Sequence, residues 1–319
     1  MLDSPRRCAP KVAIVLAGAA LFPSAALAKH PIVFTKLEKP GVPQVWAMQS
    51  DGHKRRLLHK PGYNPAISDN GKRVAFETSC GKKGTDHCIF TIRIDGHGLK
   101  RAIRFKNGHS VGGDPAWSPN GKRIAFDRYT ETFNSDTDEY DTTPSDIYTA
   151  NPDGTGVKRL TTDLGAHQPA WSPNGLRIAA AVESSVNPYT KEIWTMDTNG
   201  GNRYHVTFGS FDQVDPSWSP NGKEIGYLTR PGLGQGQEIY AVKPNGLGTR
   251  QVTHDAGISA DGVLDFAWSP AGDKVVFAGQ LADNAPDFIY REPSNGSGGF
   301  HQLKPFGGKD THNLTDVDW

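Results

Sequence analysis

Residues 114–126, DPAWSPNGKRIAF, decide the fold of this chain because most of the stretch occurs again further along it. Close copies stand at residues 168–180 (QPAWSPNGLRIAA) and 215–227 (DPSWSPNGKEIGY). Alignment on the tryptophan yields six equivalent positions, which are Ile67, Trp117, Trp171, Trp218, Trp268 and Trp319. Neighbouring positions are 47 to 54 residues apart, and a period of that size indicates a repeat architecture.

Each unit contains four β-strand signals in the same order. A short strand ends at the Trp position and is followed by a turn such as residues 118–121, in which Pro sets φ and Gly supplies the left-handed conformation of a hairpin. The second strand alternates its faces, as at 122–126, where Ile124 and Phe126 share one face and Arg123 and Ala125 share the other. The third strand carries an aliphatic-aromatic pair such as Ile147-Tyr148 and ends at an Asp-Gly or Asn-Gly turn. The fourth is short and polar, as at residues 158–161, which suits an outer edge.

The two ends of the repeat pattern indicate a closed ring. The pattern begins at a second strand, residues 32–34, whereas residues 316–319 match only the first strand of a unit. An open stack of repeats would need polar caps at its ends. We therefore predict an all-β fold: a six-bladed β-propeller with four antiparallel strands per blade and a central channel, in which the C-terminal strand joins the N-terminal blade and closes the ring.

Residues 1–28 have the composition of a secretory signal peptide. Basic residues precede an apolar run over residues 12–22, and Ala26-Leu27-Ala28 provides a small-x-small cleavage site. We predict that residues 1–28 are removed, that residues 29–319 form a single propeller domain, and that the protein is periplasmic or extracellular. Arg6-Arg7 leaves a twin-arginine export signal open as the alternative. No later segment is long and apolar enough to span a bilayer.

Charge and cysteine content exclude one class of partner and predict one covalent link. The chain has 35 Lys and Arg residues against 34 Asp and Glu residues, so no excess of positive charge favours nucleic acid. Cys80 and Cys88 follow the predicted signal peptide and flank a Gly-containing turn. In an exported protein such a pair most simply forms a disulfide across a hairpin. Metal binding is the weaker alternative because no second Cys or His pair accompanies them.

The phrase Asp-Pro-Ala-Trp-Ser-Pro-Asn-Gly-Lys-x-Ile-Ala-Phe, followed by Ile147-Tyr148 and by Asn-Pro-Asp-Gly-Thr at residues 151–155, resembles the WD-like repeat of the TolB β-propeller family. The resemblance covers essentially the whole predicted mature chain. It implies a six-bladed propeller in an exported, often periplasmic, binding protein. TolB itself has an additional N-terminal α/β domain that this chain does not match, so we expect a stand-alone propeller. Similar propellers occur in prolyl-oligopeptidase-type peptidases, which add a hydrolase domain, and in oligogalacturonate lyases.

Polar residues recur three positions before each Trp-equivalent, and they are Asn64, Asp114, Gln168, Asp215, Asp265 and Asp316. If the first strand of each blade is innermost, these side chains surround one mouth of the channel as a ring of oxygen atoms. Clustered carboxylates repel one another unless they are hydrated, hydrogen-bonded or neutralised, and calcium prefers such oxygen ligands. Two interpretations remain open: a site for a divalent cation or small ligand, and residues that cap the loops entering their strands.

Two further positions carry residue types used in catalysis. His167 stands beside Gln168 and is a candidate ligand or base of the lyase type, although a loop histidine without a catalytic role is the simpler interpretation. Residues 108–112, GHSVG, match the G-x-S-x-G nucleophile motif, which requires a strained strand-to-helix turn. A β-strand signal follows at once in this chain, so we assign no catalytic role to Ser110.

Residues 133–146, FNSDTDEYDTTPSD, form an acidic insertion between the second and third strands of one blade. The spacing lacks the Gly and Glu that an EF-hand requires. A solvated loop is the expectation, with contact to a partner or a metal as the alternatives, because variable loops on a rigid scaffold commonly carry recognition. The candidate ligands in the insertion are Asp136, Asp138, Glu139 and Asp141.

Together these features predict an exported, non-catalytic and monomeric propeller that binds a protein or another component of the cell envelope. The alternative is a metal-dependent carbohydrate-active enzyme of the lyase type, or a small-ligand binder, that uses the channel mouth. Calcium or another divalent cation in the central channel is the cofactor of that alternative.

Overall fold

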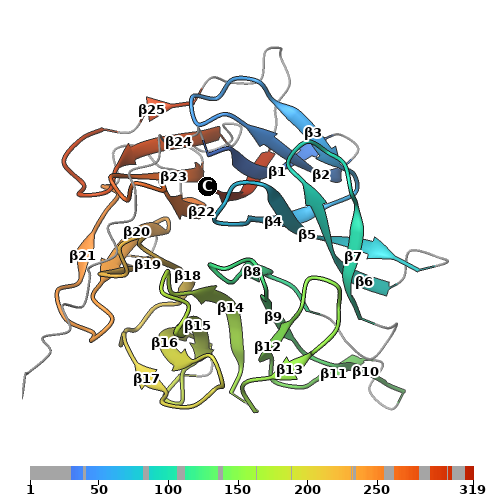
Figure 1. Cartoon of the computed structure of the whole chain (residues 1–319). Helices are drawn as coiled ribbons and strands as arrows, with labels where there is room; N and C mark the ends of the chain where they lie inside the picture. The colour runs from blue at the N-terminus through green and yellow to red at the C-terminus, as the bar shows by residue number, and fades with distance from the viewer. Residues whose placement is uncertain are drawn as a thin grey trace, which may run out of the picture.

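Six four-stranded antiparallel sheets surround a central axis, one sheet for each repeat of the sequence (Figure 1). The computed structural model describes residues 30–38, 41–81, 86–105, 112–135, 139–162, 164–187, 189–230, 232, 235–254, 262–279, 288–299, 301–303 and 313–319. Its architecture confirms the predicted six-bladed β-propeller.

The blades are numbered 1 to 6 along the chain. The strands of each blade are given from the innermost to the outermost. Blade 1 consists of β26 (Asn313–Asp318), β1 (Ile32–Glu38), β2 (Val42–Met48) and β3 (Arg56–His59), and blade 2 of β4 (Tyr63–Ile67), β5 (Arg73–Cys80), β6 (Asp86–Arg93) and β7 (Lys100–Phe105). Blade 3 consists of β8 (Ala116–Trp117), β9 (Ile124–Arg128), β12 (Asp146–Ala150) and β13 (Lys158–Arg159), and blade 4 of β14 (Ala166–Trp171), β15 (Arg177–Glu183), β16 (Lys191–Asp197) and β17 (Tyr204–His205). Blade 5 consists of β18 (Gln213–Trp218), β19 (Ile225–Thr229), β20 (Glu238–Val242) and β21 (Arg250–Gln251), and blade 6 of β22 (Val263–Trp268), β23 (Lys274–Gly279), β24 (Phe288–Pro293) and β25 (His301–Gln302).

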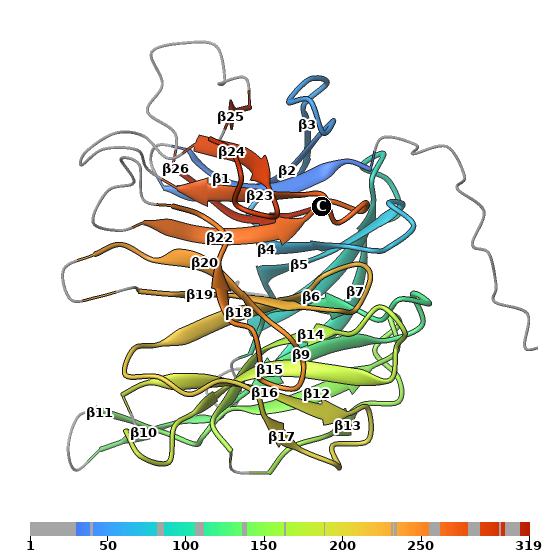
Figure 2. The ribbon, with the colours of Figure 1, turned by 90° about the vertical axis from the view of Figure 1, so that its left-hand side faces the viewer.

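The C-terminal strand closes the ring. Strand β26 pairs antiparallel with β1, so that Val33 lies opposite Asp318 (Figure 2). The indole Nε1 of Trp319 donates a hydrogen bond to the carbonyl oxygen of His30 at 3.0 Å. Blade 1 therefore combines strands from both ends of the described chain, which agrees with the prediction from the repeat pattern.

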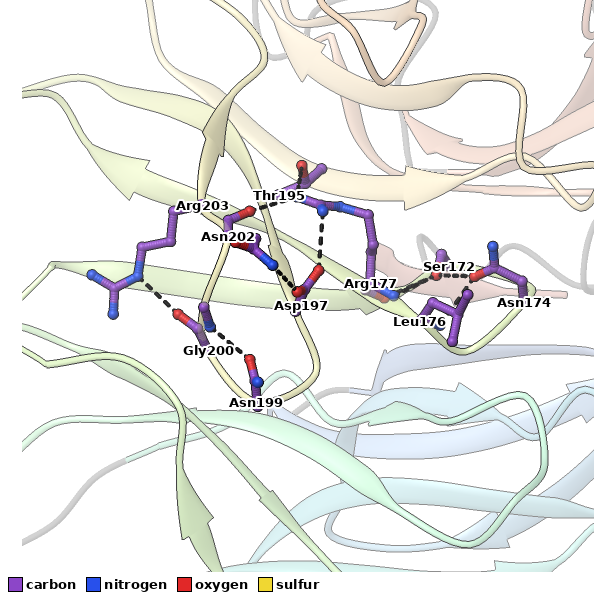
Figure 3. A network of polar contacts seen from close by, with 11 residues as sticks. Ser172, Asn174, Leu176, Arg177, Thr195, Asp197, Asn199, Gly200, Asn202 and Arg203 are labelled. Carbon is purple, nitrogen blue, oxygen red and sulfur yellow. Dashed lines mark hydrogen bonds and ion pairs between the residues drawn. The ribbon is translucent and has the colours of Figure 1, made fainter.

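The turn after each first strand is held by the motif residues themselves, as blade 4 illustrates (Figure 3). The backbone N–H of Arg177 donates to the hydroxyl of Ser172 at 2.9 Å, and that hydroxyl donates to Asn174 Oδ1 at 2.7 Å. Asn174 Oδ1 also accepts from the N–H of Leu176 at 3.0 Å. Gly175 supplies the positive φ of 70° that this geometry needs. These residues of the repeated motif therefore build a turn.

The Arg177 side chain then connects this turn to the rest of its blade (Figure 3). Its guanidinium donates to Thr195 Oγ1 at 2.9 Å, to Asp197 Oδ1 at 3.1 Å and to the carbonyl oxygen of Asn202 at 2.9 Å. A single planar donor thus joins the second strand, the third strand and the turn that follows.

The two faces of the ring differ in the connections they carry. We call one the turn face: it consists of the tight turns between first and second strands, such as residues 118–123, and between third and fourth strands, such as residues 151–157. We call the other the loop face: it consists of the connections between second and third strands, such as residues 184–190, and between successive blades, such as residues 206–212.

The acidic insertion lies on the loop face and contains regular structure, which corrects the expectation of a simple solvated loop. Strands β10 (Glu131–Asn134) and β11 (Glu139–Thr142) form a two-stranded antiparallel hairpin. Asn134 Nδ2 donates to Asp141 Oδ2 at 3.0 Å across this hairpin. Asp136 and Asp138 lie outside the described residues, as do the side chain of Glu139 and residues 108–111 of the Ser110 motif.

The hydrophobic core lies between the blades. In one cluster, Ile32 and Phe34 of β1 pack with Val276 and Ala278 of β23, so blades 1 and 6 share their apolar residues. The second strands are buried on both sides: Ala125 is as inaccessible as Ile124. A neighbouring blade covers each face of the sheet, so Ala125 is buried although it lies on the opposite face from Ile124 and Phe126.

Among the described residues, no helix has the length and apolar character needed to cross a membrane.

Candidate functional site

A cavity of about 970 Å³ opens on the turn face around the propeller axis. All six polar residues that precede the Trp-equivalents line it, together with Trp and Pro residues of the same motif. The structure thus brings Asn64, Asp114, Gln168, Asp215, Asp265 and Asp316 together as a ring, henceforth the channel ring.

Five of the six channel-ring residues have a left-handed backbone, which costs energy for any residue with a side chain. Their φ angles lie between 46° and 52°, and Asp265 is the exception. The strand register shifts beside them, for example between Val214 and Ser217 in blade 5. A register shift of this kind is typical of a β-bulge, a feature that re-aims a side chain. The bulge therefore explains why these polar groups border the channel instead of pointing between blades.

Channel-ring side chains bond to the next blade. Asn64 Nδ2 donates to Asp114 Oδ1 at 2.9 Å and to Glu77 Oε1 at 2.8 Å. The amide of Gln168 makes the same kind of contact with Asp215 of blade 5. Asp265 instead accepts from the N–H of Phe266 and from the N–H of Val317 in blade 1, both at 2.7 Å. Asp265 thus partly fits the interpretation in which these residues cap loops. The side-chain amides of Asn64 and Gln168 instead link neighbouring blades.

Burial raises the pKa values of the channel carboxyls. It raises the pKa of Asp215 to about 7, with a further contribution from the charge of Asp316. It also raises the pKa of Glu77 to about 8 and places the pKa of Asp114 well above its usual range, where the neighbouring charges of Asp127 and Glu77 add to the effect. Raised pKa values favour the protonated, neutral forms of these groups, which reduces the repulsion among them.

A preformed metal site is not visible in the part of the chain that the structure describes. No three His, Cys, Asp or Glu side chains there are arranged to hold a metal ion. Calcium in the channel therefore remains a prediction, and binding would require the ring carboxylates to rotate or to act through water.

A second cavity, of about 560 Å³, lies on the loop-face side of the ring, and Asn64 and Asp114 line both cavities. His167 lines this second cavity and is not among the residues around the turn-face mouth, where the sequence placed it. We call it the His167 cavity. Its other titratable lining residues are Glu77, His87, Asp127, Tyr129, Glu131 and Glu183.

Sequence reasoning identified Asp114 but missed the other four carboxyl groups of the His167 cavity. A signal existed for two of them: Glu77 and Asp127 each follow directly after the Phe that ends the apolar part of a second strand. The equivalent position in blade 5 is the apolar Leu228. An acid at a position that is apolar in blades 4, 5 and 6 suggests a local requirement for charge.

The predicted disulfide is confirmed. Cys80 and Cys88 are bonded to each other, with 6.0 Å between their Cα atoms, at the loop-face end of the β5–β6 hairpin. His87, beside this disulfide, contacts the hydroxyl of Tyr63 and lines the His167 cavity.

A closed ring of six four-stranded sheets around a polar channel defines a β-propeller. The chain belongs to the TolB β-propeller domain family, whose profile matches residues 32–235.

Individual relatives agree with this assignment over part of their length. A TolB homolog of Chlorobium luteolum is 32% identical over 145 residues, which are 45% of this chain and 31% of that protein. The uncharacterized peptidase YuxL of Bacillus subtilis is 29% identical over 128 residues, which are 39% of this chain and 19% of that protein. The matched segments thus span less than a third of either relative.

Solved structures share the fold over most of the chain. TolB from Acinetobacter baumannii superposes with a TM-score of 0.71 at 17% identity, over 91% of this chain and 66% of that one. An oligogalacturonate lyase from Vibrio parahaemolyticus superposes with a TM-score of 0.55 at 11% identity, over 86% and 74%. At these identities the likeness establishes the fold alone.

Proposed function

We propose that this chain is an exported, non-catalytic propeller scaffold that binds a protein or another cell-envelope component through its loop face. The observation that carries the proposal is the difference between the two faces. The turn face repeats the same tight turn from blade to blade, whereas the loop face has connections of different length and composition. Recognition on rigid scaffolds usually resides in such loops.

Exposed apolar side chains on the loop face support this proposal. Val186, Tyr189 and Phe208 are 91%, 89% and 73% exposed, the three highest values among the large apolar side chains that the structure describes. The loops that carry them are tied together, because the N–H of Lys191 donates to Asp212 Oδ1 at 2.8 Å. Apolar side chains that are this exposed and lie on neighbouring loops are a feature of protein interaction sites.

A site-specific crosslinking experiment tests the loop face as the binding surface. The photoreactive residue p-benzoylphenylalanine, placed at position 189 in cells that express the full chain, should yield a discrete crosslinked species. The matched control is the same residue at position 176, because Leu176 is also exposed, at 66%, but belongs to the turn face. No discrete species from position 189, or the same species from both positions, would contradict the proposal.

Export is the second part of the proposal, and it depends on residues outside the described range. Mass spectrometry of the exported protein should find a mature chain that begins at Lys29. An intact N-terminus on protein that remains inside the cell would contradict export.

A metal-dependent carbohydrate-active enzyme or small-ligand binder at the turn-face mouth is the second candidate. The channel ring of carboxyl and amide groups around a 970 Å³ cavity is the observation that favours it. An oligogalacturonate is itself an anion, so a substrate of that class would need a cation to offset the ring carboxylates.

Calorimetric titration of calcium, and then of manganese, into metal-stripped protein spanning residues 29–319 tests this candidate. Saturable binding that is lost in Asp215→Asn would support it. An affinity that is unchanged in Asp114→Asn, Asp215→Asn and Asp265→Asn would exclude the ring as the site.

A further inference from the structure

The His167 cavity is strongly acidic. Five carboxyl groups line it, and no Lys or Arg is among its described lining residues. The negative potential also acts on Tyr129, whose pKa is raised by burial and then by Glu131, Asp127 and Glu77. The carboxyl groups in the wall are Glu77, Asp114, Asp127, Glu131 and Glu183.

Asp127 lies beside one ring nitrogen of His167. Asp127 Oδ1 accepts from the N–H of Gly113 at 2.8 Å, and its Oδ2 lies 3.3 Å from His167 Nδ1. Since a carboxylate only accepts hydrogen bonds, this contact favours the neutral tautomer with its proton on Nδ1 and a lone pair on Nε2.

His167 Nε2 is buried and has no hydrogen-bond partner. Glu183 Oε1 lies 3.7 Å from Nε2, which is too far for a hydrogen bond, and a carboxylate cannot donate one. A buried acceptor without a donor is costly. A ligand that brings two N–H groups would satisfy both Nε2 and Glu183.

Glycines allow two of these carboxyls into the cavity wall. A Cβ on Gly165 would lie 2.3 Å from Cδ of Glu183, and a Cβ on Gly113 would lie 2.3 Å from Oε1 of Glu77. Any larger residue at either position would displace the acid beside it. The backbone is therefore shaped around these carboxyl groups.

We infer that the His167 cavity is a recognition site for the basic side chain, arginine or lysine, of a protein partner. The guanidinium or ammonium group donates to His167 Nε2 and to Glu183 Oε1, and the acidic wall neutralises its charge. The cavity size falls within the range of small-ligand sites. This inference rests on the proposed binding function, and it identifies the chemistry that the partner presents.

The test uses a short probe, so that no partner needs to be known. Calorimetry and backbone amide NMR shifts should detect saturable binding of acetyl-Gly-Arg-Gly-amide to the full mature protein, with shifts at Gly165 and His167. The same peptide with citrulline, which has the shape of arginine but no charge, should not bind. Because each charged hydrogen bond contributes more than 1 kcal/mol, Glu183→Gln should weaken arginine binding about tenfold.

Two variants and one further ligand make the outcome decisive. Glu183 is 44% exposed, so Glu183→Gln leaves the hydrophobic core intact. Asp127→Asn tests whether Asp127 orients the imidazole of His167. Asp153→Asn on the turn face removes the same charge and should leave binding unchanged. Equal binding of arginine and citrulline peptides, unchanged affinity in Glu183→Gln, or binding of spermidine without binding of the arginine peptide would each overturn the inference.

Failure of this inference is distinguishable from failure of the proposed function. A discrete crosslink from position 189 together with no binding of the arginine peptide would retain the loop face as the binding surface and reject only the basic side-chain site.

Discussion

The side-chain amide of Asn64 donates a hydrogen bond to Asp114 in the next blade, with 2.9 Å between Nδ2 and Oδ1, although 50 residues separate the two positions. The same amide donates to Glu77 at 2.8 Å. One neutral amide therefore satisfies two carboxyl groups whose pKa values are raised by burial, and it does so where two blades meet.

Replacing this amide with a carboxyl should destabilise the protein. Asn64→Asp removes both donors and adds a charge beside two others, so the free energy of unfolding at pH 8 should fall by about 2–3 kcal/mol. At pH 5 the loss in unfolding free energy should be smaller, because protonation of these carboxyl groups reduces their mutual repulsion. Urea unfolding at the two pH values measures both effects.

The control for this change is Asn70→Asp in a turn of the same blade. Only the oxygen of Asn70 is needed there, since it accepts from Ser68 Oγ and from the N–H of Lys72, each at 3.0 Å. An aspartate retains that role, so stability should be nearly unchanged. Equal losses in the two variants would contradict the role assigned to the Asn64 amide.

The raised pKa of Glu77 predicts how stability depends on pH. Folding raises this pKa from an ordinary value of 4.5 to about 8. Between these values the folded protein binds more protons than the unfolded chain, so stability falls as pH rises through this window. The melting temperature should be several degrees higher at pH 5 than at pH 8.

Glu77→Gln should flatten this dependence, because glutamine can still accept from Asn64 and from the N–H of Asp114 but does not titrate. Glu183→Gln, at a solvent-accessible site, serves as the matched control. A melting temperature that depends as steeply on pH in Glu77→Gln as in the parent protein would show that another group is responsible.

Removal of β26 should open the ring. Deleting residues 313–319 eliminates the strand that pairs with β1. It also removes the contact between Asp318 Oδ2 and the N–H of Ile67, which measures 2.7 Å. The truncated protein should lose its cooperative thermal transition in calorimetry or circular dichroism. Melting at the temperature of the intact protein would contradict closure through a shared blade.

Loss of the disulfide should lower stability by a predictable amount. Cys80 and Cys88 are 8 residues apart, and on the chain-entropy model a loop this short contributes roughly 2–3 kcal/mol. Urea unfolding of a Cys80→Ser, Cys88→Ser variant should show this loss. Reductant should bring the parent protein to the same midpoint and leave the variant unaffected, and any other pattern would argue against a stabilising bond.

Turn chemistry explains why the fold could be predicted. Gly175 in the motif turn and Gly200 after the third strand both have positive φ, at 70° and 91°, and each turn is specified by residues within a few positions of its glycine. The acidic insertion lacks such a turn signal, and its hairpin was missed for that reason.

The channel ring was only partly predictable. The period placed polar residues at equivalent positions, but the left-handed backbone of Asp114 and Asp215 does not follow from local propensity. Likewise, Asp127 and His167 belong to different blades, and the meeting of their side chains depends on the angle between those blades.

The sequence by itself determined the number of blades, the order of their strands, the closing strand and the disulfide, because period, turn residues and cysteine spacing act over short stretches of chain. The tertiary structure alone decided which polar groups meet: the amide of Asn64 between two carboxyls, and His167 between Asp127 and Glu183. Those encounters bury charge between separate repeats, and their energies exist only once the ring has closed and excluded water from the contacts.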